Sequence, residues 1–145
     1  MNTNHWSRKL KAIGACKDAV KWAKEQPSFA QAWQTCERGD WMLWLAGKMH
    51  DKPEWPTRQQ LVLAACDCAE LSLKYVPKGE DRPRVAIETA RAWAKGKATI
   101  DEVAAAAAAG AAADADAYAA AAARLSTLSQ CAVLVRKALT VPEVL

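Results

Sequence analysis

The C-terminal part of the chain carries an alanine-rich helical pattern that only Gly110 interrupts between Thr99 and Thr140. Alanine is the strongest helix former, and its small side chain lets helix axes approach to about 8 Å. A straight helix of roughly 40 residues would be about 60 Å long, whereas a domain of 145 residues has a radius of gyration of about 15 Å. We therefore expect a long Ala-rich C-terminal helix that bends, splits or projects, with Gly110 as its weakest point and 124–129 as the second.

Two other interpretations of the alanine tract are disfavoured. A flexible linker conflicts with the high helix propensity of alanine. A membrane span over Val103–Ala123 would contain Gly110, Asp114 and Asp116, and alanine is too weakly apolar to insert. The N-terminus also lacks the long apolar run of a signal peptide. The sequence thus predicts a cytoplasmic protein without a membrane segment.

Apolar residues recur at helical spacing along the rest of the chain, which has few Gly and Pro residues and little strand-like alternation. The pattern predicts five further helices, over 7–25, 29–36, 41–49, 61–76 and 83–95. Three capping boxes support these boundaries: Ser28 with Gln31, Thr57 with Gln60, and Thr99 with Glu102. We expect an all-α protein, a single compact helical domain of about six helices over residues 6–140, followed by a loose C-terminal tail over 141–145.

The stretch Trp33–Leu45 concentrates three of the seven tryptophans around an Arg-Gly-Asp turn. Gly39 can adopt the positive φ that ends a helix, and Asp40 can accept hydrogen bonds from the first free amides of the next one. Asp81 is placed in the same way before the helix over 83–95. These features predict where helices meet, and they do not by themselves indicate a function.

Metal binding and catalysis find little support in the sequence. Cys66 and Cys68 would point roughly 200° apart on a helix, so they cannot chelate one ion together. We expect the five cysteines to be reduced and mostly buried. There are two histidines, and there is no Gly-rich phosphate loop, Gly-x-Ser-x-Gly or His-Glu-x-x-His motif. The sequence predicts a protein that is not an enzyme and that uses neither a metal nor a cofactor.

Charged residues beside tryptophans form two candidate binding groups. They could be structural ion pairs and caps that fix how the helices meet, or they could line a pocket or a partner surface on which Arg and Trp act as anchors. The two groups consist of Arg38, Asp40, Trp41 and Trp44, and of Asp81, Arg82 and Arg84.

The first helical segment is basic. Lys17, Lys21 and Lys24 share the face opposite its apolar stripe. Such a face could contact phosphates, but it is equally typical of a solvated helix, and the net charge of +4 is modest. Nucleic acid is therefore a possible partner that the sequence does not favour.

Several blocks of sequence resemble the Imm5-like family of immunity proteins, which are small all-helical proteins of bacteria and phages. The blocks are 15–19 (ACKDA), 33–45 (WQTCERGDWMLWL), 81–84 (DRPR), 86–88 (AIE) and Trp93, and the alanine-rich last helix follows them. The resemblance as a whole extends over roughly 10–139. The resemblance implies a non-catalytic protein that neutralises a toxin by direct binding.

Two alternatives to toxin binding remain open. A phage-encoded member could inhibit a host defence complex. The chain could instead be a small-molecule-binding protein or hydrolase with a pocket made by Arg38, Asp40, Asp81 and Arg82. A homodimer through the alanine-rich helix is also compatible with the sequence, since its small side chains would allow close packing with a second copy.

Overall fold

In the computed structural model, the described residues are 4–117 and 121–145, and the described side chains are those of 4–109 and 126–145. All regular elements in this part of the chain are helices, which confirms the all-α prediction. The number is larger than the six expected. The elements are α1 (Ser7–Ala12), α2 (Lys17–Lys24), α3 (Phe29–Thr35), α4 (Gly39–Met49), α5 (Arg58–Glu70), the short 3-10 helix η1 (Leu73–Tyr75), α6 (Arg82–Ala94), α7 (Ile100–Ala117) and α8 (Ala121–Ala138).

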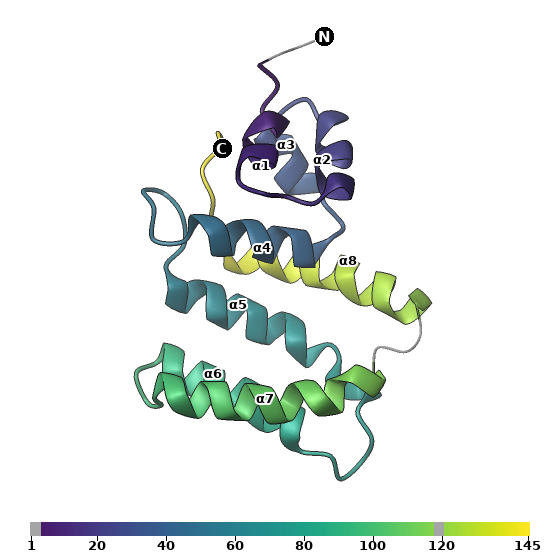
Figure 1. Ribbon diagram of the computed structural model, residues 1–145, viewed down its shortest axis with the longest axis vertical. Helices are drawn as coiled ribbons and strands as arrows, with labels where there is room; N and C mark the ends of the chain where they lie inside the picture. Colours follow the sequence, from purple (N-terminus) through teal and green to yellow (C-terminus); the bar gives the residue numbers. More distant parts are fainter. Residues whose placement is uncertain (1–3, 118–120) are drawn as a thin grey trace.

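The helices follow one another along the long axis of the molecule (Figure 1). Helices α1, α2 and α3 form a small group at one end, where both termini also lie. Helix α4 packs beside α8, and α5 packs against α4 and α8 on one side and against α6 on the other. The hairpin of α6 and α7 closes the opposite end. The candidate residues near α4 and those at the start of α6 are thus separated by α5.

The single helix expected over 7–25 is two helices in the structure. Helix α1 ends at Ala12, and Gly14 adopts a φ of +92° before α2 begins at Lys17. A glycine can take this left-handed conformation without strain, so the chain reverses there. Periodicity did not reveal the turn because the apolar spacing continues across it.

The long C-terminal helix is likewise divided, and the expected break at Gly110 is wrong. Helix α7 continues through Gly110 to Ala117, and α8 begins at Ala121, so the second expected weak point, 124–129, lies inside α8. Helix α7 packs against α6, whereas α8 packs against α4 and α5. The two helices thus lie against different parts of the domain, which a straight helix could not do.

Small side chains allow close packing at the centre of the domain. Ala46 on α4, Ala64 on α5, and Ala132 and Val135 on α8 are essentially inaccessible to solvent. Cys68 on α5 and Cys131 on α8 form a disulfide bond, so the expectation that all five cysteines are reduced is wrong for this pair. Sequence spacing could not reveal it, because the two residues are 63 positions apart and meet only when α5 packs on α8.

Several helix boundaries follow the caps read from the sequence. Thr57 with Gln60 and Thr99 with Glu102 form reciprocal capping boxes, as predicted. The Ser28 hydroxyl accepts a hydrogen bond from the amide of Gln31 at 3.2 Å. Asp81 occupies the N-cap position of α6 without a capping hydrogen bond from its side chain, so the predicted role is wrong; a Glu80 carboxylate oxygen accepts from the Arg82 amide instead. Helix α6 ends as expected, with Gly96 at a φ of +76°.

Helix α5 differs in extent from the predicted element. Helix α5 ends at Glu70 rather than at 76, and η1 follows it. In the segment 141–145, Val141 and Leu145 pack against the core, and the Lys9 ammonium donates a hydrogen bond to the Leu145 carbonyl.

The described helices include none with the length and hydropathy needed to cross a membrane. The span considered above, Val103–Ala123, includes 118–120, which lie outside the described residues.

An ion-pair cluster on the surface joins α5 to α6. The Arg91 guanidinium on α6 donates hydrogen bonds to the carboxylates of Asp67, at 2.8 Å, and Glu70, both on α5.

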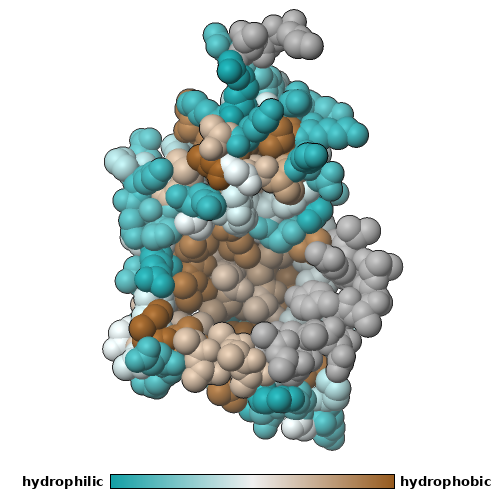
Figure 2. Space-filling model, viewed as in Figure 1, coloured by the Kyte–Doolittle hydropathy of each residue, from teal (hydrophilic) through white to brown (hydrophobic). Residues whose placement is uncertain are grey.

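Figure 2 shows that the face seen in Figure 1 is hollowed and apolar between α4 and the α6–α7 hairpin, while hydrophilic surface covers much of the α1–α3 end.

Candidate functional site

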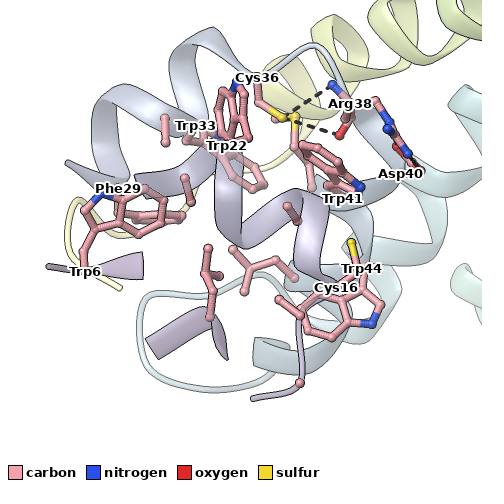
Figure 3. A pocket seen from close by; sticks show the side chains of 18 residues that line it. Trp6, Cys16, Trp22, Phe29, Trp33, Cys36, Arg38, Asp40, Trp41 and Trp44 are labelled. Carbon is pink, nitrogen blue, oxygen red and sulfur yellow. Dashed lines mark hydrogen bonds and ion pairs between the residues drawn. The ribbon is translucent and has the colours of Figure 1, made fainter. Parts of the chain in front are cut away.

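A cavity of about 450 Å³ lies between α1, α2 and α3 on one side and α4 on the other. This volume falls within the range of about 300–1,000 Å³ that is typical of small-molecule sites. Five of the seven tryptophans line it, and Figure 3 shows their side chains gathered around one space. These tryptophans are Trp6, Trp22, Trp33, Trp41 and Trp44.

Aromatic rings form connected walls around this cavity, which we call the aromatic pocket. The ring centroids of Trp22 and Trp41 are 6.1 Å apart, and those of Phe29 and Trp33 are also 6.1 Å apart. Phe29 further contacts Trp6 at 5.7 Å. These tilted arrangements are the ones that aromatic pairs prefer, so the walls are held by mutual ring contacts.

The charged groups of the aromatic pocket neutralise each other. The Arg38 guanidinium donates two parallel hydrogen bonds to the Asp40 carboxylate, at 2.8 and 2.7 Å. The same guanidinium lies over the Trp41 ring, with its central carbon 4.3 Å from the ring centroid. Burial acts to raise the pKa of Asp40, but the hydrogen bonds and the positive charge of Arg38, together with hydrogen bonds from backbone amides, outweigh it, and the pKa is lowered. The pair therefore remains an ion pair at neutral pH.

The position of Gly39 differs from the sequence-based expectation. Helix α4 begins at Gly39 with Arg38 at its N-cap, and Gly39 does not adopt a positive φ. A Cβ atom at this position would stand 2.6 Å from the Cβ of Cys131, so the glycine is needed for the close approach of α4 to α8. Asp40 falls inside the first turn of α4, where its carboxylate pairs with Arg38.

The segment between α3 and α4 is fixed by an arginine that the sequence analysis missed. Arg136 on α8 donates hydrogen bonds to the carbonyl oxygens of Cys36, at 2.6 Å, and Trp33, at 3.2 Å. These carbonyls belong to the end of α3, where backbone acceptors lack partners within the helix. Nothing in the local sequence of Arg136 indicates this contact, because its partners lie about 100 positions away.

Cys36 lines the aromatic pocket but shows no sign of activation. Its sulfur accepts a hydrogen bond from the Arg38 amide at 3.4 Å, and burial raises the pKa of the Cys36 thiol. A nucleophilic cysteine needs a lowered pKa or an adjacent base. Neither histidine lines the pocket: His5 hydrogen-bonds to Ser7 and Gln26, and His50 to Asp51.

The second candidate group lies apart from the aromatic pocket, at the start of α6. Arg82 pairs with Glu80 at 2.6 Å, and Arg84 pairs with Asp81 at 3.3 Å and with Glu88 at 2.9 Å. The hydrogen bonds from Arg82 lower the pKa of Glu80 to about 2. The aromatic pocket is lined by Arg38 and Asp40 but not by Asp81 or Arg82, so the four charged residues do not form one shared pocket.

Two large apolar side chains are exposed in the segment around this second group. Tyr75 in η1 is 39% exposed, and Val85 in α6 is 43% exposed. We refer to the exposed residues of this segment, Tyr75, Asp81, Arg82, Arg84 and Val85, as the η1–α6 surface, after the elements that carry or adjoin them. Sequence analysis named the charged residues but not the two apolar ones.

The lysines of the predicted basic face are all exposed on α2: Lys17, Lys21 and Lys24. Among the described residues, no group of three or more His, Cys, Asp or Glu side chains is placed to hold a metal ion. Cys66 and Cys68 face different partners, since the Cys66 thiol contacts the Ile87 carbonyl while Cys68 is bonded to Cys131. They cannot share a ligand, as their spacing predicted.

Trp6, Trp22 and Trp33 are pocket residues that the sequence analysis did not name as binding residues. The clustering of tryptophans in the sequence could have indicated them, because five of the seven tryptophans fall within the first 44 residues. Trp6, Trp22 and Trp33 belong to three different helices or their caps, so the sequence did not show that they line one pocket. Their meeting depends on the turn at Gly14, which folds α1 back on α2.

Comparison with known proteins gives one family. The family model described as "Imm-5 like putative immunity protein" matches residues 52–136, which is more than half of the chain. The match includes the η1–α6 surface, but it begins after the aromatic pocket and after the block 33–45, so it is shorter than the resemblance over 10–139 proposed above. No curated protein and no solved structure matches the chain.

Proposed function

Because the chain belongs to the Imm-5 like putative immunity protein family, we propose that it neutralises a protein toxin by direct, non-catalytic binding. The observation that carries this proposal is the family match over residues 52–136. The matched segment contains α5, α6, α7 and most of α8, so it comprises the larger part of the packed domain rather than a short motif.

The η1–α6 surface is our candidate for the contact with the toxin. Tyrosine and arginine are the residue types over-represented among the side chains that dominate binding energy in protein interfaces. Arg82 and Arg84 are each held by a carboxylate, so their guanidinium groups are positioned before a partner arrives. The exposed Tyr75 and Val85 would supply apolar contact area in the same segment.

Co-expression tests the proposed neutralisation. Candidate toxins, beginning with those encoded beside the gene, are expressed in a host with and without this chain, and growth is measured. We expect the chain to restore growth and to form a stoichiometric complex with the toxin in calorimetric titration. Protection without a complex, or no protection by any candidate, would contradict direct neutralisation.

Charge reversal tests the η1–α6 surface. The double substitution Arg82→Glu and Arg84→Glu should weaken the complex at least tenfold, which corresponds to about 1.4 kcal/mol, while the protein stays folded. The matched control is Lys21→Glu with Lys24→Glu, two reversals on exposed positions of α2. Loss of affinity in the control alone would instead assign the contact to the basic face.

Inhibition of a host defence complex is the alternative to toxin binding. Purification of the tagged chain from its host would distinguish the two hypotheses, because the partner that co-purifies can be identified. The variant with Arg82→Glu and Arg84→Glu should no longer retain that partner. Recovery of a defence complex whose activity the chain blocks would replace the toxin by that complex as the partner.

A further inference from the structure

The aromatic pocket reaches into the core of the α1–α4 region and is not a shallow surface groove. Several residues that line it are themselves buried, including Phe29, Ala32, Trp33 and Met42. The pocket is partly open to solvent, so a small molecule could enter it. Its volume of about 450 Å³ and its mostly apolar, aromatic lining are typical of small-molecule sites.

The walls select a planar apolar ring. Trp22 and Trp41 contact each other at a tilt of 52°, and Trp44 completes this side of the pocket. A flat aromatic molecule could stack against one indole and meet the edge of another, which is the arrangement that aromatic rings favour.

Charge complementarity indicates that the occupant is neutral. Arg38 and Asp40 are the charged residues that line the pocket, and they are paired with each other through two hydrogen bonds. A ligand carboxylate at this pair would lie close to the Asp40 carboxylate, and a ligand ammonium would lie close to the Arg38 guanidinium. Either charged ligand would therefore meet a like charge, whereas a neutral ligand would leave the pair undisturbed.

We propose that the aromatic pocket is a binding site for a small, uncharged aromatic molecule. This site goes beyond the proposed toxin binding, because its lining residues lie outside the segment that matches the immunity family. The occupant is a free molecule rather than an aromatic side chain of a protein partner, since the inner wall is formed by buried residues that a protein surface could reach only by inserting a long projection.

Titration with indole tests the proposal on the isolated chain, without any toxin. The side-chain N–H signals of the seven tryptophans in NMR spectra report where indole binds. Five of these signals belong to residues that line the pocket, whereas Trp55 and Trp93 do not line it. We expect saturable 1:1 binding by calorimetry, with signal shifts concentrated in Trp22, Trp41 and Trp44. The signal of Trp93 should remain unchanged.

Two charged relatives of indole test the charge preference. Indole-3-acetate adds a carboxylate and tryptamine adds an ammonium group, and each should bind at least tenfold more weakly than indole. Tighter binding of either one would overturn the proposal of a neutral ligand. N-acetyl-tryptophanamide represents a side chain that carries a peptide backbone; if it bound at least tenfold more tightly than indole, the pocket would belong to a partner protein instead.

A cavity-filling variant localises the binding. Ala19→Leu adds apolar volume to the pocket wall, so it should reduce indole affinity at least tenfold while the melting temperature stays the same or rises. The matched control is Ala30→Leu, at a half-buried position of α3 that does not line the pocket, and it should change affinity less than twofold.

The indole experiments test the aromatic pocket independently of the proposed toxin binding. Absence of saturable indole binding, or binding that Ala19→Leu leaves unchanged, would overturn the pocket proposal. Neither result would bear on toxin neutralisation, which is measured through the η1–α6 surface. Conversely, failure of every toxin assay would leave the indole titration fully interpretable.

Discussion

Gly39 at the start of α4 lies directly against Cys131 on α8. A Cβ atom at residue 39 would stand 2.6 Å from the Cys131 Cβ and 2.7 Å from the Ala132 backbone nitrogen. Backbone atoms cannot move aside as a flexible side chain can, so Gly39→Ala must push α4 away from α8. We expect a loss of about 1–3 kcal/mol in the free energy of unfolding, although alanine is the better helix former. Urea denaturation measures this loss.

Gly47 provides the control on the same helix. A Cβ atom there would meet the Leu61 side chain at 3.8 Å, which is an ordinary contact distance. Gly47→Ala should therefore stabilise the protein by up to about 1 kcal/mol through helix propensity. Equal effects of the two substitutions would show that the contact between Gly39 and Cys131 does not limit the packing of α4 on α8.

Arg136→Met should destabilise the junction between α3 and α4. The substitution keeps much of the side-chain length but removes the donors to the Trp33 and Cys36 carbonyls. Hydrogen bonds from a charged group contribute about 1.5–3 kcal/mol, and we expect a loss of that size in chemical denaturation. Lys137→Met changes the charge by the same amount at an exposed position of α8, and it should shift stability by no more than about 0.5 kcal/mol.

Arg91→Ala should loosen the contact between α5 and α6 in a pH-dependent way. The hydrogen bond from Arg91 holds the pKa of Glu70 below its usual value. The stabilisation from this pair is therefore present above the unfolded pKa of about 4.3 and is lost as pH falls through the lower folded pKa. The exposed positions of Asp67 and Glu70 limit the loss to about 1 kcal/mol at pH 7.

Thermal unfolding of this variant and of the wild type between pH 7 and pH 2 checks that prediction. The difference between the two proteins should shrink as pH falls below the unfolded pKa of about 4.3 and through the lower folded pKa of Glu70. Arg84→Ala removes an arginine whose pairs lie within α6 and its cap, and it should lower the melting temperature less. A difference for Arg91→Ala that stayed constant across the whole pH range would contradict an ionic origin.

The Cys68–Cys131 disulfide predicts a specific thiol count. Alkylation of the denatured, unreduced protein should modify three cysteines: Cys16, Cys36 and Cys66. Because the bond closes a loop between residues 63 positions apart, the chain-entropy model gives about 4 kcal/mol of stabilisation that reduction removes. Modification of all five cysteines before reduction would show that the two thiols are in contact without being bonded.

Asp40→Ala tests whether the Arg38–Asp40 pair of the aromatic pocket is structural. Both side chains are about one-third exposed, so the pair should contribute no more than about 1 kcal/mol to the free energy of unfolding. Urea denaturation of both single variants and of the double variant with Arg38→Ala gives the interaction energy of the pair, separated from other effects of each substitution. A loss well above about 3 kcal/mol for Asp40→Ala alone would mean that Arg38 is left as an uncompensated buried charge.

Local signals in the sequence located most of the helices and several of their ends. The Thr57–Gln60 and Thr99–Glu102 capping boxes mark the starts of α5 and α7 because the capping groups are three residues apart and meet within one turn. The break within the alanine tract was misplaced at Gly110. A glycine inside a helix costs only about 1 kcal/mol, which the packing of α7 on α6 can offset.

The sequence by itself determined the all-α class, and it singled out four of the residues that line the aromatic pocket: Arg38, Asp40, Trp41 and Trp44. These follow from spacing and propensity, which act over a few residues. Only the tertiary structure decided that Trp6, Trp22 and Trp33 join that pocket, that Cys68 meets Cys131, and that Arg136 binds the end of α3. Each of those contacts joins separate helices, and it exists only because burial of apolar surface folds the chain back on itself.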